Sequence, residues 1–294
     1  MIPATTPLIV FSHANSFPSG TYRVLFEALR ARGWRVEALE KFGHDPRYPV
    51  TSNWPHLVRQ LADFVTQQVQ PQGEPLFLVG HSLGGFLSLM TAALHPQLGG
   101  TPVRGVVMLD SPVLGGWKAR ALAAAKHTRL IGAVSPGRIS RKRRNRWASA
   151  AEALEHFRHK RAFARWDPRV LQDYVAHGTH DEVGPDGSVQ RVLSFDRDVE
   201  TAIYNTLPHH LDRLLRRHPL RCPVAFIGGT ESEEMRRVGL TLTHKLCGRT
   251  PSPRLQFLPG THLFPMELPQ ATAEAIDRAL RNFMASSPPS LASR

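Results

Sequence analysis

Residues 80–84 read G-H-S-L-G, a G-x-S-x-G motif centred on Ser82. A serine at a sharp turn from a strand into a helix has strained backbone angles and an exposed hydroxyl. Side chains two positions before and after it would collide in such a turn, which is why glycine occupies both positions. The apolar run 76–79 and the helical pattern 82–94 provide that setting. The motif therefore predicts nucleophilic chemistry at Ser82.

A serine hydroxyl is a poor nucleophile at neutral pH and needs a general base within hydrogen-bond reach. The chain has 15 histidines, so position has to select among them. His262 follows the last apolar run, 255–258, in a turn headed by Gly260. We expect His262 to be the base, and we expect His13 and His81, at the ends of two strands, to be structural or to line the pocket.

These residues are positioned by short apolar runs that alternate with helical patterns, which is typical of a parallel α/β sheet. The expected strands are residues 8–11, 34–39, 76–79, 106–109, 224–227 and 255–258. The expected helices are residues 22–29, 54–65, 82–94 and 269–284, with further helical patterns at 117–126 and 148–163. Between Pro112 and Pro219 the alternation stops, and helix formers, histidine and arginine predominate. We interpret residues 113–218 as an insertion above the sheet.

The sequence resembles the α/β-hydrolase family, and specifically its capped serine hydrolases, over residues 7–284. Three signals of the family appear in chain order: His13-Ala14-Asn15 after the first strand, the elbow around Ser82, and Gly260-Thr261-His262 after the last strand. The resemblance implies that Ser82 is the nucleophile and His262 the base.

The resemblance also implies the fold, an α/β protein with a mostly parallel sheet of about six strands. The sheet is shortened at its N-terminal side, because the family usually has two strands before the one that begins here at Leu8. A mainly helical cap is expected from the insertion. The predicted domains are a core, a cap and a disordered tail, with the bounds 1–112 and 219–284 for the core, 113–218 for the cap and 285–294 for the tail.

Two backbone amides are expected to form the oxyanion hole. The amide of Leu83, at the start of the helix, is aimed at an oxyanion. The family resemblance maps the second amide onto Asn15. This chain departs from the usual His-Gly pair by having Ala14, so Ala14 and Ser16 stay open as alternative donors.

The acid that orients the histidine has three candidates. The family usually carries it in the loop after its seventh strand, here residues 228–234, where Glu231 replaces the usual aspartate and Glu234 follows. Some members use the loop after the sixth strand, which here places Asp110 at a strand end. We prefer Asp110, with Glu231 as the alternative acid. The competing interpretation of Asp110 is structural, as a cap of the turn that follows it.

These motifs predict a serine hydrolase, an esterase or lipase-like enzyme that cleaves a carboxylic ester through an acyl-serine intermediate. Thioesterases and carbon–carbon bond hydrolases use the same groups and are the enzymatic alternatives. A catalytically silent binding protein with this fold is the alternative of another class. No cofactor or metal is expected, since the chain has no P-loop, dinucleotide fingerprint or zinc motif.

The 294-residue chain carries 37 Lys and Arg against 24 Asp and Glu, a formal net charge of +13. The insertion 113–218 holds 20 of these cations and 11 of the anions, a net of +9, so most of the excess lies there. Six cations crowd one stretch: Arg138, Arg141, Lys142, Arg143, Arg144 and Arg146. We interpret this stretch as a solvated surface, and we hypothesise that it attracts an anionic ester or thioester substrate.

The remaining expectations concern partners and compartment. A nucleic-acid partner is not expected, because the basic stretch has no interleaved aromatic residues and no recognised module. No apolar run approaches the roughly 18–20 residues that span a bilayer, although the charge would permit weak contact with a membrane surface. Two cysteines, Cys222 and Cys247, form no disulfide framework. A cytoplasmic protein that acts on a small molecule is the resulting expectation.

Overall fold

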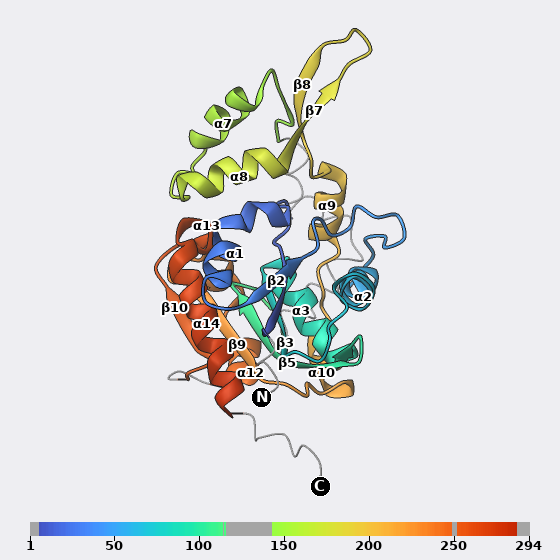
Figure 1. Ribbon diagram of the computed structural model, residues 1–294, viewed down its shortest axis with the longest axis vertical. Coiled ribbons are helices and arrows are strands. Elements are labelled where there is room, and N and C mark those ends of the chain that lie inside the picture. The colour runs from blue at the N-terminus through green and yellow to red at the C-terminus, as the bar shows by residue number, and fades with distance from the viewer. Residues whose placement is uncertain (1–5, 114, 116–142, 249–251, 287–294) are drawn as a thin grey trace.

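A mostly parallel sheet forms the centre of the computed structural model, which describes residues 6–113, 115, 143–248 and 252–286 (Figure 1). Its strands are β1 (Leu8–Ser12), β2 (Arg35–Ala38), β3 (Leu76–His81), β4 (Gln97–Leu98), β5 (Thr101–Leu109), β9 (Val224–Gly229) and β10 (Leu255–Leu258). Six of them pair in parallel in the order β10-β9-β5-β3-β1-β2, and the short β4 pairs with β5 antiparallel. The predicted sheet of about six parallel strands is confirmed.

Side chains alternate between the two faces of the sheet, because successive residues of a strand point to opposite sides. In β1, Leu8 and Val10 belong to one buried cluster, and Ile9 and Phe11 belong to the other. β3 continues this pattern, since Leu8 pairs in register with Leu76 of the same cluster. Both faces are apolar, and the strands therefore read as continuous apolar runs.

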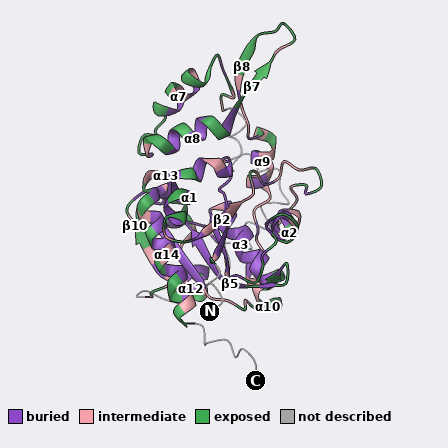
Figure 2. Ribbon diagram, in the orientation of Figure 1, coloured by how far each residue is buried: buried purple, intermediate pink, exposed green. Residues whose placement is uncertain are grey.

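Helices cover both faces, and the sheet between them is the buried centre of the molecule (Figure 2). Packed in the cluster of Leu8 are α2 (Pro55–Phe64), α3 (Leu83–Leu94), α10 (Leu211–Arg217) and α12 (Thr241–Cys247). Packed in the cluster of Ile9 are α1 (Arg23–Arg30) and α14 (Pro269–Ser286). Short helices lie in the loops after β9 and β10, namely α11 (Glu233–Val238) and α13 (Phe264–Glu267). No helix of the described residues is long and apolar enough to cross a bilayer.

The four helices predicted outside residues 113–218 are found, with boundaries shifted by one or two residues. Of the other two, the helix predicted over 148–163 is the shorter α7 (Ala150–Arg158), and the helix predicted over 117–126 lies outside the described residues. The closing helix α14 reaches Ser286 and so extends into the segment predicted to be a disordered tail. Residues 287–294 of that tail lie outside the described part of the chain. The helix continues because its apolar positions keep helical spacing as far as the buried Phe283.

Above the carboxyl edge of the sheet, the described part of the insertion combines helices with a small sheet (Figure 1). Its strands form an antiparallel sheet in the order β6-β8-β7, and its helices precede and follow the β7–β8 hairpin. The bounds are β6 (Arg146–Trp147), α7 (Ala150–Arg158), α8 (Pro168–Gly178), β7 (Thr179–Val183), β8 (Val189–Leu193) and α9 (Arg197–Asn205). A turn at the hairpin tip is closed by the Gly187 amide, which donates to the Gly184 carbonyl at 3.0 Å.

The basic stretch is only partly described, since residues 138–142 lie outside the described residues. Each of its described arginines forms an ion pair with a glutamate. The pairs are Arg143 with Glu200 at 2.8 Å, Arg144 with Glu152 at 2.5 Å, and Arg146 with Glu182 at 2.8 Å. The interpretation of a solvated surface is wrong for Arg143, whose side chain is 22% exposed against a Glu200 side chain that is 5% exposed. A buried carboxylate needs a partner, and Arg143 supplies it.

Candidate active site

Three predicted site residues follow the carboxyl ends of nearby strands. Ser82 follows β3, Asp110 follows β5 and His262 lies in the loop after β10, within the strand order β10-β9-β5-β3. The backbone ladder extends through two of them: the Ser82 amide donates to the Leu109 carbonyl at 2.9 Å, and the Asp110 amide donates to the Ile227 carbonyl at 2.8 Å. Parallel pairing thus gathers distant residues at one edge of the sheet.

The turn at Ser82 is strained in the way that the motif predicts. Its backbone angles are φ 52° and ψ −113°, outside the regions that a residue with a side chain prefers. A Cβ atom at Gly80 would collide with the Gly84 backbone, and a Cβ at Gly84 would collide with the Ser12 carbonyl. Glycine at both positions therefore lets β3 and α3 approach closely enough to form this turn.

The side chains of Ser82, His262 and Asp110 form a continuous hydrogen-bonded row. Ser82 Oγ lies 3.0 Å from His262 Nε2, and His262 Nδ1 lies 2.7 Å from Asp110 Oδ2. A carboxylate only accepts, so Nδ1 carries the proton and donates it to Asp110. Nε2 is then the nitrogen without a proton, and it accepts the hydrogen bond of the Ser82 hydroxyl. In this arrangement the imidazole is placed to take the serine proton.

Asp110 is fully buried and satisfied by three donors. Its Oδ1 accepts from the Gly229 amide at 2.7 Å, and its Oδ2 accepts from the Ser232 hydroxyl at 2.5 Å as well as from His262. The Ser232 oxygen in turn accepts from the Met235 amide at 3.2 Å, which caps α11. Sequence reasoning missed Ser232, although a serine before two glutamates is a typical helix start.

The two alternative acids lie farther from the imidazole. Glu231 is half-exposed and forms a two-pronged ion pair with Arg165, at 2.7 and 3.1 Å. Glu234 approaches more closely, with its Oε2 4.0 Å from His262 Nδ1, but its side chain is 46% exposed. The structure brings Asp110 to His262, and it does not bring Glu231 there.

The environment of His262 sets its protonation. Burial lowers the pKa of His262. The hydrogen bond to Asp110, the negative charge of Asp110 and that of Glu234 raise this pKa, and together they outweigh the effect of burial. The pKa of His262 therefore lies above the 6.5 of an ordinary histidine. A base with this pKa is suited to accept a proton near neutral pH.

The turn after β1 limits the candidates for the second oxyanion donor. The Ala14 amide donates to the Tyr22 hydroxyl at 3.0 Å, so it is already engaged. The Phe17 amide donates to the Ala14 carbonyl at 3.2 Å and closes a turn in which Ser16 has a φ of 79°. Within the described part of the chain, the amides of Asn15, Ser16 and Leu83 make no hydrogen bond to protein. All three amides are therefore available to a ligand, and only Ala14 is removed from the candidates.

The two strand-end histidines are fully buried, and both ring nitrogens of each lie within hydrogen-bond distance of a protein atom. His13 contacts the Ala14 carbonyl through Nδ1 at 2.8 Å, and its Nε2 accepts from the Phe42 amide at 3.0 Å. Burial lowers the pKa of His13 to about 4. Burial also lowers the pKa of His81 far below its ordinary value. Both imidazoles are therefore neutral at physiological pH.

Comparison with known proteins places this site in a family. The model described as "Alpha/beta hydrolase family" matches residues 9–275, from β1 into α14. The chain belongs to the alpha/beta hydrolase family. The match includes both the loop of Ser82 and the loop of His262, and the protein is therefore a hydrolase by family.

Curated relatives of this hydrolase include two monoglyceride lipases. The one from Homo sapiens is 35% identical over 140 residues, and the one from Rattus norvegicus is 29% identical over the same length. The alignments cover 46% of this chain and 45% of each lipase, so the chain spans less than half the length of these relatives.

Solved structures of other hydrolases share the fold over nearly the whole chain. E-2-(acetamidomethylene)succinate hydrolase has a TM-score of 0.64 and 22% identity, and the match covers 95% of this chain and 92% of that one. A peroxisomal alpha-beta-hydrolase from Saccharomyces cerevisiae has a TM-score of 0.68 and 17% identity, and the match covers 98% of this chain and 79% of that one. A thioesterase domain from the curacin biosynthetic pathway has a TM-score of 0.64 and 18% identity, and the match covers 93% of this chain and 91% of that one.

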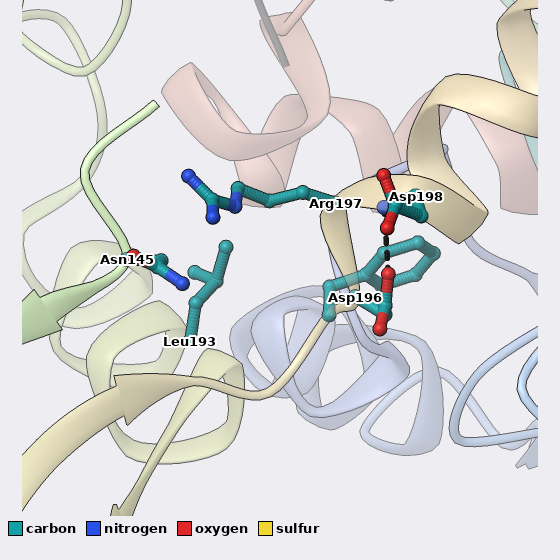
Figure 3. Close-up of a pocket in the computed structure, with 6 residues that line it drawn as sticks. Asn145, Leu193, Asp196, Arg197 and Asp198 are labelled. Carbon is teal, nitrogen blue, oxygen red and sulfur yellow. Dashed lines mark hydrogen bonds between the residues drawn. The ribbon is translucent and has the colours of Figure 1, made fainter. Parts of the chain in front are cut away.

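The insertion also contains a polar cavity of about 370 Å³. Six residues line it: Asn145, Leu193, Phe195, Asp196, Arg197 and Asp198. Figure 3 shows Arg197 extended towards Asn145 and away from the Asp196 carboxylate, which accepts from the Asp198 amide. None of the six residues belongs to the row of Ser82, His262 and Asp110.

Proposed function

We propose that the protein is a serine hydrolase that cleaves a carboxylic ester through an acyl-serine intermediate. The observation that carries the proposal is the row from Ser82 through His262 to Asp110, with its distances of 3.0 and 2.7 Å. Membership of the family and the lipases among the relatives support the same class of reaction. Ser82 is the nucleophile in this proposal, His262 the general base and Asp110 the acid.

In the first half-reaction, Ser82 Oγ attacks the ester carbonyl while His262 Nε2 takes the hydroxyl proton. Asp110 accepts the Nδ1 hydrogen bond and stabilises the imidazolium that forms. The tetrahedral intermediate collapses when His262 returns the proton to the alcohol oxygen, which breaks the ester bond and leaves acyl-Ser82. Water then attacks the acyl group with the same histidine as base, which releases the acid and restores the serine.

The oxyanion is held in this proposal by the amides of Leu83 and Asn15. Leu83 opens α3, so its amide has no partner within the helix and lies at the positive end of the helix dipole. Asn15 is fixed through its side chain, whose Nδ2 donates to the Glu200 carbonyl of α9 at 3.1 Å. Each such donor typically contributes about 10²- to 10³-fold to kcat.

A neutral ester with an apolar acyl group is the substrate class that the site supports best. Phe17, next to the oxyanion turn, contacts Trp166 and Tyr174 of the cap at ring-centroid distances of 5.5 and 5.6 Å. Phe17 is partly exposed and offers apolar surface beside the turn, and the buried Trp166 and Tyr174 pack behind it. The hypothesis of an anionic substrate draws less support, because every described arginine of the basic stretch pairs with a glutamate.

The proposal is tested by labelling with a fluorophosphonate probe, followed by a panel of substrates. We expect the folded wild-type protein and a Ser188→Ala control on the hairpin to be labelled, and Ser82→Ala to stay unlabelled. The panel holds neutral esters of increasing chain length, matched thioesters and a carbon–carbon bond substrate. Turnover of thioesters alone would replace the ester assignment, and folded wild-type protein without a Ser82 adduct would favour a silent binding protein.

A further inference from the structure

A buried chain of hydrogen bonds joins the two loops on either side of Ser82. It begins at the oxyanion turn, where the Ala14 amide lies 3.0 Å from the Tyr22 hydroxyl. That hydroxyl lies 2.8 Å from His81 Nδ1, and His81 Nε2 lies 2.9 Å from the His262 carbonyl. Tyr22 is 1% exposed and His81 is fully buried, so water does not compete for these contacts.

The two ends of the chain place one proton. The Ala14 amide can only donate, and the His262 carbonyl can only accept, so His81 must carry a proton on Nε2. In the neutral imidazole, Nδ1 then accepts from the Tyr22 hydroxyl, and every hydrogen bond of the chain has one direction. Burial lowers the pKa of His81, and the nearby His262 lowers it further, which keeps the imidazole in this neutral state.

Each end of the chain touches backbone that the proposed reaction needs in place. The Ala14 amide is held by Tyr22 one residue before Asn15, whose own amide remains available to the oxyanion. The His262 carbonyl is held by His81, which restrains the backbone of the proposed base. His81 is also the residue just before the nucleophile, and it is the last residue of β3.

We infer that Tyr22 and His81 are positioning residues, which hold the oxyanion turn and the His262 loop at a fixed separation across Ser82. The inference rests on the proposed serine hydrolase function, and it assigns these residues no contact with substrate. They align groups that act on the transition state, so their loss lowers kcat and leaves KM nearly unchanged. A misplacement of about 1 Å at such a site costs on the order of 100-fold in rate.

Three replacements of His81 separate positioning from packing. In His81→Gln the amide nitrogen reaches the place of Nε2, in His81→Asn a polar atom takes the place of Nδ1, and His81→Leu fills the space without hydrogen bonds. We expect kcat to fall roughly 100-fold in the Leu variant, to recover to within about tenfold in the Gln variant, and to stay low in the Asn variant, with KM within about twofold throughout. Wild-type kcat in the Leu variant, or equal losses in all three folded variants, would overturn the inference.

Tyr22→Phe tests the other half of the chain. Removal of the hydroxyl should lower kcat by roughly tenfold, and combined with His81→Leu it should cost less than the product of the two single losses. The control is Tyr48→Phe, which removes a hydroxyl that donates to Asp63 at 2.8 Å away from the Ser82 row, and which should leave kcat unchanged. Losses that multiply fully would show two independent contacts and contradict the inference.

The tautomer of His81 provides a test that needs neither activity nor a variant that folds. Nitrogen-15 NMR of the wild-type protein should show His81 neutral with its proton on Nε2 at pH 7, and a proton on Nδ1 would overturn the inference. Failure of the proposed function is recognised separately. It appears as wild-type protein that fluorophosphonate does not label, whereas labelled, active protein with an unaffected His81→Leu variant disproves the positioning role alone.

Discussion

The loops after β5 and β9 lie side by side at the carboxyl edge of the sheet, and each offers a carboxylate for the third site position. The β5 loop contributes the Asp110 carboxylate, which is 2.7 Å from His262 and fully buried. The β9 loop contributes donors instead, the Gly229 amide and the Ser232 hydroxyl, both bonded to Asp110. Its own Glu231 pairs with Arg165 at the surface. One loop holds the charge and its neighbour stabilises that charge.

The difference follows from side-chain length and solvation. Asp110 sits at the end of a buried strand with a φ of 44°, so its short side chain meets the imidazole directly and is desolvated there. A buried carboxylate is tolerated only when its oxygens receive strong hydrogen bonds, and the β9 loop supplies them. Glu231 stays solvated beside an arginine and needs no such support.

The largest loss of activity is expected when the Asp110 carboxylate of the β5 loop is replaced. In Asp110→Asn one oxygen becomes an amide nitrogen, which would face the Nδ1 proton of His262 and favour the tautomer that cannot accept from Ser82. We expect kcat for an ester to fall by roughly 10³- to 10⁴-fold while the protein stays folded. Steady-state kinetics with a melting curve measure this. Full turnover in the folded Asn variant would show that the acid lies elsewhere.

Ser232→Ala tests whether the β9 loop supports Asp110. The variant removes one donor from Asp110 and the cap of α11, so we expect kcat to fall about tenfold and stability to fall by about 1 kcal/mol. Ser149→Ala is the matched control, because its hydroxyl caps α7 by accepting from the Glu152 amide and has no contact with the acid. It should lose similar stability and no activity. Equal kcat in both variants would remove the β9 loop from the support of Asp110.

A smaller effect is expected at Glu234, the second carboxylate near His262. Because the pKa of His262 is raised above 6.5 and the neutral form is active, kcat/KM should fall as the pH drops through a value above 6.5. Glu234 contributes to that rise, so Glu234→Gln should move this acidic limb to lower pH by about half a unit. The exposed neighbour Glu233, which pairs with Arg237, provides the control variant Glu233→Gln. An identical pH profile for both variants would exclude Glu234 from the electrostatics of the site.

The smallest effect is expected at the alternative acid. Glu231→Gln removes an exposed ion pair with Arg165 and leaves the row of Ser82 intact, so kcat and KM should stay within about twofold of wild type. The same ester assay as for Asp110→Asn measures it. A loss of several hundredfold here, with Asp110→Asn active, would reverse the comparison between the two loops.

Local patterns predicted the strands, the elbow and the loop of His262 because each depends on neighbours in sequence. The apolar runs at 76–79 and 106–109 lie within β3 and β5, and the glycines around Ser82 meet the close approaches expected of them. The choice between Asp110 and Glu231 could not be made in this way. Both follow apolar strands, and only the distance to His262 separates them.

The contacts that the sequence does not predict join residues that are remote in the chain. Ser232 contacts Asp110 across 122 positions, and His81 contacts the His262 carbonyl across 181. Arg143 pairs with Glu200 across 57 positions, although its stretch is typical of a solvated surface. Their side-chain types are common, so no local pattern marks these contacts.

The order of elements, the faces of the sheet and the strained serine could be predicted from the amino-acid sequence, because hydrophobic periodicity and glycine sterics act over a few residues. Only the fold brings one carboxylate to His262, leaves backbone amides available beside Ser82, and pairs the charges of the insertion. Those outcomes depend on the parallel order β10-β9-β5-β3, which places distant loops within hydrogen-bond reach. Hydrogen bonds and desolvation act over a few ångströms of space, whatever the separation along the chain.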